Sequence, residues 1–156
     1  MNNLKEKKLN DKGFSLVELI IVIAIMAVLI GVLAPQYLKY VERSRNSTDR
    51  DNAAALANAV QVWGSETDLG AGTALATDTT GTTMTVNQSG NVVIAGTNSQ
   101  AVNDALINAG LCASGATLGG AANCPTTCAS RTAWTSYEVR VKVDANGVVT
   151  VTNDLP

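Results

Sequence analysis

A run of 20 uncharged residues, Leu19 to Leu38, constrains this chain more than any other feature of its sequence. A helix of about 20 apolar residues is long enough to cross the hydrocarbon core of a bilayer. Residues 1–13, which precede the run, contain four lysines and two acidic residues, a net charge of +2. Basic flanks remain on the cytoplasmic side of a membrane segment. The sequence therefore predicts an N-in, C-out membrane helix.

Two ordinary interpretations of such a segment explain only part of it. A cleaved secretory signal peptide has an apolar core of about 7–15 residues and small residues at its cleavage site. Here the core is longer, and the only plausible site, residues 32–34, is followed by Pro35. A plain signal anchor explains the length and the charge bias, but it does not explain the acidic residue Glu18.

Glu18 is the feature of the apolar block that most needs a partner. A carboxylate in a membrane segment costs about 2.5–3.5 kcal/mol at mid-depth and less near an edge. No cation lies in the following 20 residues. Cleavage between Gly13 and Phe14 would create an α-amine, which has an ordinary pKa of about 7.7–8.0 and would be largely protonated. In an assembly of staggered chains, this amine could neutralise Glu18 of a neighbour.

The segment Lys12-Gly13-Phe14-Ser15-Leu16-Val17-Glu18 resembles the class III signal peptide of type IV pilins: a basic leader, Gly, Phe, and Glu four residues later. The apolar residues 19–30 continue the pattern. Gly31 and Pro35 resemble the helix-breaking residues of major pilins. The resemblance covers about residues 8–45, a quarter of the chain.

The resemblance implies a pilin fold and a processing pathway. A membrane-embedded prepilin peptidase and N-methyltransferase would remove the leader after Gly13 and methylate Phe14. The mature subunit would wait in the cytoplasmic membrane, and an assembly platform with its ATPase would move it into an extracellular homo-oligomeric filament. Glu18 would direct docking onto Phe14 of an adjacent subunit. A pseudopilin of a type II secretion or DNA-uptake system shares these features and stays as the alternative.

Four segments are expected: a cleaved leader (1–13), a transmembrane and assembly helix (14–38), an amphipathic second half of the same helix (39–64) and a globular head (65–156). Apolar residues at helical spacing continue as far as Trp63, and Gly64 is a candidate C-cap. Pro35 lacks an amide hydrogen and should kink the helix, with Gly31 adding local freedom.

The head is predicted to be a small antiparallel sheet packed on the helix, which gives an α+β fold. Residues 65–76 form a loop, and residues 82–86 and 91–95 form a hairpin. A short helix extends from Ser99, its N-cap, to Ala109, with Gly110 as its stop. Alternating apolar residues at 137–143 predict a strand that returns as residues 148–152.

The charged residues just beyond the apolar block have two readings: a solvated helix face, or inter-subunit ion pairs that are weak if exposed. They are Glu42, Arg43, Arg45, Asp49, Arg50 and Asp51.

Three cysteines, Cys112, Cys124 and Cys128, lie in the translocated head. An extracellular setting favours one disulfide and leaves one thiol, with three pairings possible. Free thiols are the second reading, and a metal site is the weakest because the spacing does not fit a zinc knuckle.

The sequence predicts no enzyme, cofactor or metal site. The chain has no histidine, which removes Ser-His-Asp and Cys-His catalysis and His-ligated metals. The net charge of -2 gives no basic surface for nucleic acid. A membrane-anchored binding or enzymatic domain is the more distant alternative, and the lack of a catalytic cluster argues against it.

Overall fold

The computed structural model describes residues 13–67, 74–90, 92–113, 121–122, 124 and 126–155. Residues 1–12 of the leader, residues 68–73 of the predicted 65–76 loop and the middle of the Cys112–Cys124 segment lie outside these residues. The chain divides into two compact units, residues 1–39 and 40–156.

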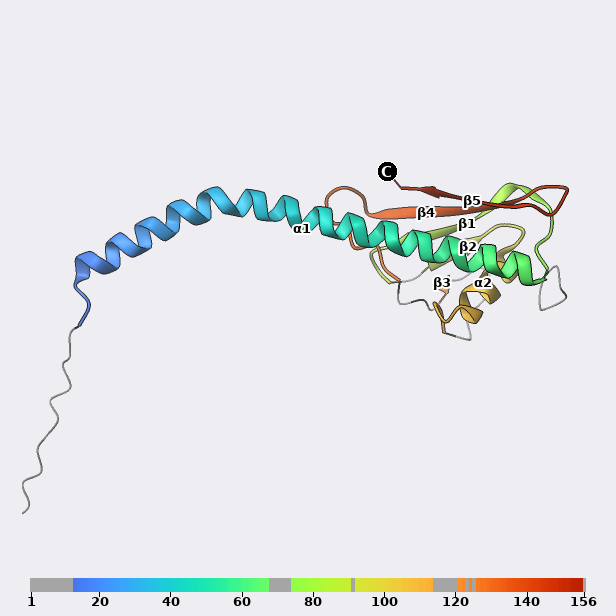
Figure 1. The fold of residues 1–156 in the computed structure, drawn as a ribbon, viewed down its shortest axis with the longest axis horizontal. Coiled ribbons are helices and arrows are strands. Elements are labelled where there is room, and N and C mark those ends of the chain that lie inside the picture. The colour runs from blue at the N-terminus through green and yellow to red at the C-terminus, as the bar shows by residue number, and fades with distance from the viewer. Residues whose placement is uncertain are drawn as a thin grey trace, which may run out of the picture. The chain divides into compact units, whose positions relative to one another are not determined.

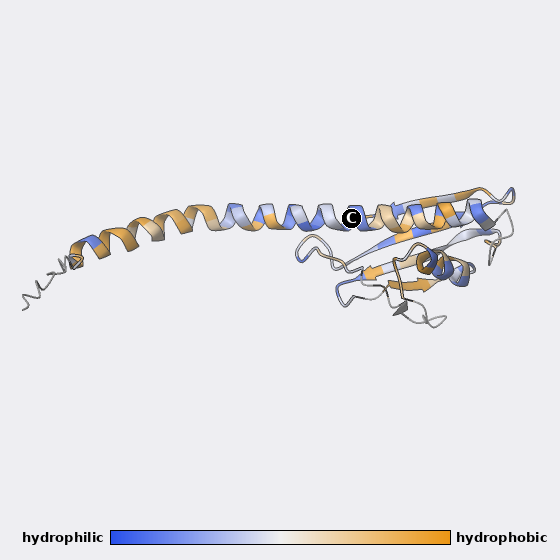
Figure 2. Cartoon of the chain, turned by 60° about the horizontal axis from the view of Figure 1, so that its bottom comes forward, coloured by the Kyte–Doolittle hydropathy of each residue, from blue (hydrophilic) through white to orange (hydrophobic). Residues whose placement is uncertain are grey.

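One helix, α1 (Leu16–Thr67), supplies the first unit and the first element of the second. Every residue from Gly13 to Tyr40 is exposed within the chain. Figure 2 shows the first part of α1 as almost continuously hydrophobic and the second part as mixed. This helix is long and apolar enough to cross a membrane. Pro35 lies inside it, and the helix assignment continues on both sides.

The predicted end of this helix at Gly64 is wrong, because α1 continues to Thr67. The loop expected from Ser65 therefore begins later. A Cβ at Gly64 would lie 2.8 Å from Cγ2 of Val149. Glycine here permits close approach of the helix to a strand, a packing role that a sequence pattern cannot distinguish from a C-cap.

The second unit contains a five-stranded antiparallel sheet in the order β3-β2-β1-β4-β5. The strands are β1 (Asp78–Asn87), β2 (Val92–Ala95), β3 (Ala121–Ala122), β4 (Ser136–Val143) and β5 (Val149–Asp154). The two predicted hairpins, β1–β2 and β4–β5, are confirmed. The two-residue strand β3 was not predicted.

The second part of α1 runs along this sheet (Figure 1), and buried residues of both form the hydrophobic core. Leu56 and Val60 from the helix are buried together with alternate residues of β1 and β4. The strand contributions include Met84, Val86, Tyr137, Val139 and Val141. A long helix packed on a small antiparallel sheet confirms the predicted α+β architecture.

The short helix α2 (Ser99–Asn108) confirms the predicted helix but corrects its start. Its N-cap is Asn98, not Ser99, and no side chain caps it. The Asn98 amide instead accepts a hydrogen bond from the Ala76 N–H at 2.7 Å and donates one to the Ala76 carbonyl at 2.8 Å. Gly110 follows the helix at φ +71°, which confirms it as the stop.

Candidate functional site

The predicted processing and assembly residues lie at the N-terminal end of α1. Gly13 and Phe14 precede the helix, and the Phe14 side chain is 90% exposed. Phe14, Glu18, Leu19, Ile21 and Val22 line a shallow hollow of the surface. The hollow is apolar apart from one carboxylate.

Glu18 also caps its own helix. The Ser15 N–H donates a hydrogen bond to Oε2 of Glu18 at 2.8 Å, and the Ser15 carbonyl accepts the first helical bond from Leu19 N at 3.2 Å. Ser15 and Glu18 are thus spaced as in a capping box, in which the acid at the third helical position satisfies the N-cap amide. The S-x-x-E spacing of Ser15 and Glu18 is the sequence signal of this capping box.

The bond from Ser15 leaves most of the hydrogen-bond acceptor capacity of the Glu18 carboxylate unused. An ionised carboxylate can accept about four hydrogen bonds, and Oε2 receives one. An added cation or N–H donor can therefore bind at Glu18 while the Ser15 bond is kept.

Gly31 and Pro35 are exposed and lie farther along the same helix. Gly31 lies thirteen positions after Glu18 in α1, which is about 20 Å at 1.5 Å per residue. A Cβ added at Gly31 would meet nothing within 4 Å. The proposed role of these two residues in bending stays a prediction.

The charged patch beyond the apolar block contains a buried anchor that the sequence analysis missed. Asp49 is 0% exposed, and its carboxylate accepts hydrogen bonds from the backbone of the segment before β4. The Ala129 N–H donates at 2.6 Å, the Ser130 N–H at 3.0 Å and the Trp134 indole Nε1–H at 2.9 Å. Asp49 therefore ties residues 128–134 to α1.

Glu42, seven residues before Asp49, holds the same segment. Its Oε1 accepts bonds from the Ser130 hydroxyl at 2.7 Å and from the N–H groups of Arg131 at 2.8 Å and Thr132 at 2.9 Å. These bonds, led by those from Thr132 and Ser130, hold the pKa of Glu42 well below its ordinary value. Seven residues are about two helical turns, so both acids share one face of α1.

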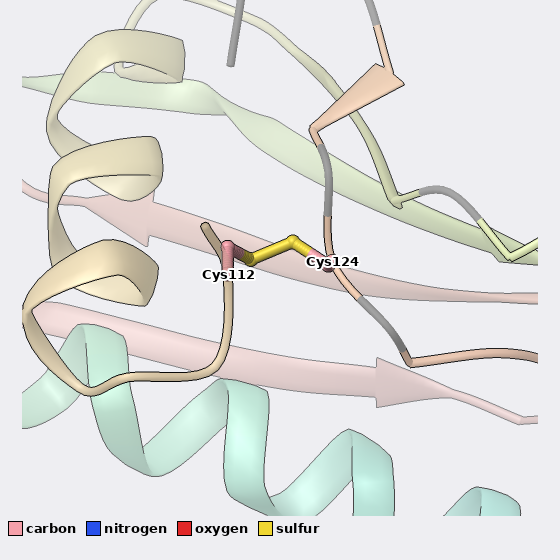
Figure 3. Close-up of a disulfide and its surroundings, with 2 residues drawn as sticks. All are labelled: Cys112 and Cys124. Carbon is pink, nitrogen blue, oxygen red and sulfur yellow. A yellow bond between two sulfur atoms is a disulfide. The ribbon is translucent and has the colours of Figure 1, made fainter. Parts of the chain in front are cut away.

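The cysteines form one disulfide and one thiol. Cys112, just after α2, is bonded to Cys124, and Figure 3 shows this bridge beside the sheet. Cys128 is free and buried. All three residues belong to the hydrophobic core of the second unit. Among the described residues, no group of three His, Cys, Asp or Glu side chains could hold a metal ion.

Comparison with known proteins finds sequence matches that include this N-terminal segment. Residues 8–34 match the family model of the prokaryotic N-terminal methylation motif. The chain is 38% identical over 58 residues to the type IV major pilin protein PilA of Myxococcus xanthus, and the match covers 37% of this chain and 26% of that relative. It is also 38% identical over 58 residues to prepilin peptidase-dependent protein A of Clostridium perfringens, covering 36% of this chain and 41% of the relative.

The chain thus spans less than half the length of either relative, and no solved structure matches it significantly. The matching family model covers the segment that contains Gly13, Phe14 and Glu18. The exposed apolar helix and this motif are both expected of a prepilin. The chain therefore carries the prepilin N-terminal methylation motif and is homologous, over about a third of its length, to a type IV major pilin.

Proposed function

We propose that this chain is the structural subunit of a type IV pilus filament. The observation that carries the proposal is the apolar part of α1, which is exposed along its whole length within the chain. A contiguous apolar surface of this kind requires a membrane or a protein partner. A helical assembly supplies such partners once the subunit leaves the membrane.

Processing creates the assembly group. A prepilin peptidase cuts after Gly13 and methylates Phe14, and the new amine carries a positive charge. Glu18 keeps its hydrogen bond from Ser15 and also accepts a hydrogen bond from the charged Phe14 amine of a neighbouring subunit. Both charges are then satisfied only when two subunits dock in register.

Before assembly, the apolar helix spans the cytoplasmic membrane with the leader inside and the head outside. The assembly platform and its ATPase then move the subunit into the extracellular fibre. The head has a structural role in this account, and no enzymatic activity is assigned to it.

The experiment that tests this function is electron microscopy of sheared surface material labelled with an antibody against the head. Long labelled fibres are expected. Trace amounts in short envelope-spanning assemblies would instead identify a pseudopilin. Label confined to isolated subunits in the membrane, without any polymer, would contradict both functions.

Processing is tested separately by replacing Gly13 with a bulky residue. The peptidase must approach the peptide bond after Gly13 closely, so the variant should keep its 13-residue leader. A gel should show the larger form. A mature-sized product from this variant would contradict cleavage at this bond.

A further inference from the structure

The head contains a thiol that could disturb its own disulfide. Cys128 lies four residues after Cys124, which is bonded to Cys112. If the Cys128 thiolate attacked the Cys124 sulfur, a Cys124–Cys128 bond would form and the Cys112–Cys124 bond would break. Cys112 would leave as a thiolate and take up the proton that Cys128 had lost. This exchange needs no oxidant, so oxidising conditions alone do not prevent it.

The structure holds Cys128 in a position that opposes this attack. Its side chain is 1% exposed, and its N–H donates a hydrogen bond to the Asn87 carbonyl at the end of β1 at 3.0 Å. The Cys128 Sγ–H donates to Oδ2 of Asp49 at 3.5 Å. The thiol is therefore fixed by the backbone on one side and by a carboxylate on the other.

Asp49 acts on the thiol by its charge as well as by its hydrogen bond. Burial and then the neighbouring Asp49 carboxylate raise the pKa of Cys128 to about 11, against a smaller opposing effect of the Arg131 charge. Burial, and then the charge of Asp49, raise the pKa of Tyr137 as well. The attacking group in exchange is the thiolate, so this environment suppresses the reactive form.

We propose that Asp49 selects the disulfide of the head: it keeps Cys128 as a buried thiol, so that Cys112 pairs with Cys124. The carboxylate that anchors residues 128–134 to α1 would then also determine which of three possible pairings forms. This inference does not depend on the proposed function, because it concerns only residues within the second unit, 40–156.

The first test measures the reactivity of Cys128 in the full-length chain in detergent. Native protein is treated with iodoacetamide at neutral pH, alongside protein unfolded in urea, and labelled peptides are identified by mass spectrometry. Each pKa unit reduces the thiolate fraction about tenfold, so native Cys128 should react at least about a hundredfold more slowly. Equal rates in native and unfolded protein would overturn the proposal.

The second test compares Asp49→Asn with the matched variant Glu42→Gln. Glu42 holds the same segment through Ser130 and Arg131, whereas the Cys128 thiol donates to Asp49, so Glu42→Gln controls for loosening of the loop. Both proteins are equilibrated in a glutathione redox buffer and their disulfides are mapped. Bridges containing Cys128 are expected in Asp49→Asn and not in Glu42→Gln. The same pairing in both variants, whether native or scrambled, would overturn the role of Asp49.

A third variant keeps Asp49 and covers the case in which Asp49→Asn does not fold. In Cys112→Ser, Cys124 can pair only with Cys128 or with glutathione. The proposal expects a free or glutathionylated Cys124 and an unmodified Cys128. A Cys124–Cys128 bridge as the main product would contradict it.

Discussion

Two acidic side chains on one helix, Glu18 and Asp49, have opposite surroundings. Glu18 is exposed and accepts one hydrogen bond, from its own Ser15. Asp49 is fully buried and accepts three N–H bonds from the segment before β4. The Asp49 carboxylate thus uses its hydrogen-bond acceptor capacity within the chain. The Glu18 carboxylate keeps most of its acceptor capacity available for another molecule.

The apolar residues of the two regions differ in the same way. From Phe14 to Leu38 the large apolar side chains are exposed, whereas Leu56 and Val60 are buried in the core of the head. Hydrophobicity alone does not distinguish these regions; the presence of a packed partner does. The second part of α1 packs on its own sheet, whereas the side chains of the first part are exposed within the described residues.

The largest expected effect is on assembly. Glu18→Ala should still be processed, but the amine of the neighbouring subunit would lose its partner. Removing one member of a buried ion pair costs about 3–5 kcal/mol, which is enough to abolish filaments. Fibre yield in sheared material measures this effect. The matched variant Glu66→Ala, an exposed acid later in α1, should give normal fibres; equal yields from both variants would contradict a special role of Glu18.

A second prediction concerns the buried acid. Asp49→Ala leaves three N–H donors without their acceptor, and each buried unsatisfied group costs about 1–3 kcal/mol. We expect a loss of about 3–5 kcal/mol in the free energy of unfolding of the head. Urea denaturation followed by Trp fluorescence measures this loss. A change below about 1 kcal/mol would show that the Asp49 anchor is not important for stability.

Two glycines provide a smaller, paired comparison. Gly96 has φ +133°, and an added Cβ would lie 2.6 Å from the backbone Cα of Thr82. Gly96→Ala should therefore destabilise the head by about 2–3 kcal/mol. Gly31→Ala adds a methyl group to open space and improves helix propensity, so it should not destabilise α1. Thermal unfolding measures both variants, and similar losses in the two would contradict the comparison.

The smallest effect is a pH dependence caused by Glu42. Its pKa is lowered in the folded chain, chiefly by the bonds from Thr132 and Ser130. Its contribution to stability is therefore present above its ordinary pKa, about 4.3, and is lost as the pH falls below it. Glu42→Gln should be less stable than wild type at pH 7, and the gap should narrow toward pH 3. Denaturation midpoints across this range measure the gap; a constant gap would contradict the assignment.

Periodic and turn patterns predicted most of the fold. The alternation in residues 137–143 predicted a strand with one buried face, and the structure buries Tyr137, Val139, Val141 and Val143. The positive φ of Gly110 agrees with its prediction as a helix stop. These signals are local, because the side chains of one element determine them.

Features that depend on distant contacts were not predictable. Gly64 was predicted to be a C-cap, but its lack of a side chain is explained by the close contact with Val149. Ser99 was predicted to be the N-cap of the short helix, but the N-cap is Asn98. Glu42 and Asp49 were read as part of a surface patch, because their partners lie about 80 to 90 residues later in the chain. At the N-terminus, by contrast, the motif lies within a few consecutive residues and could be recognised directly.

The most direct test of the central claim, that the exposed apolar helix is the assembly element of a processed subunit, is the intact mass of the extracellular polymer. We expect a chain that begins at Phe14, carries one added methyl group on that residue and is otherwise lighter than the precursor by the mass of residues 1–13. A polymer whose subunits keep residues 1–13, or whose Phe14 amine is unmodified, would contradict the account.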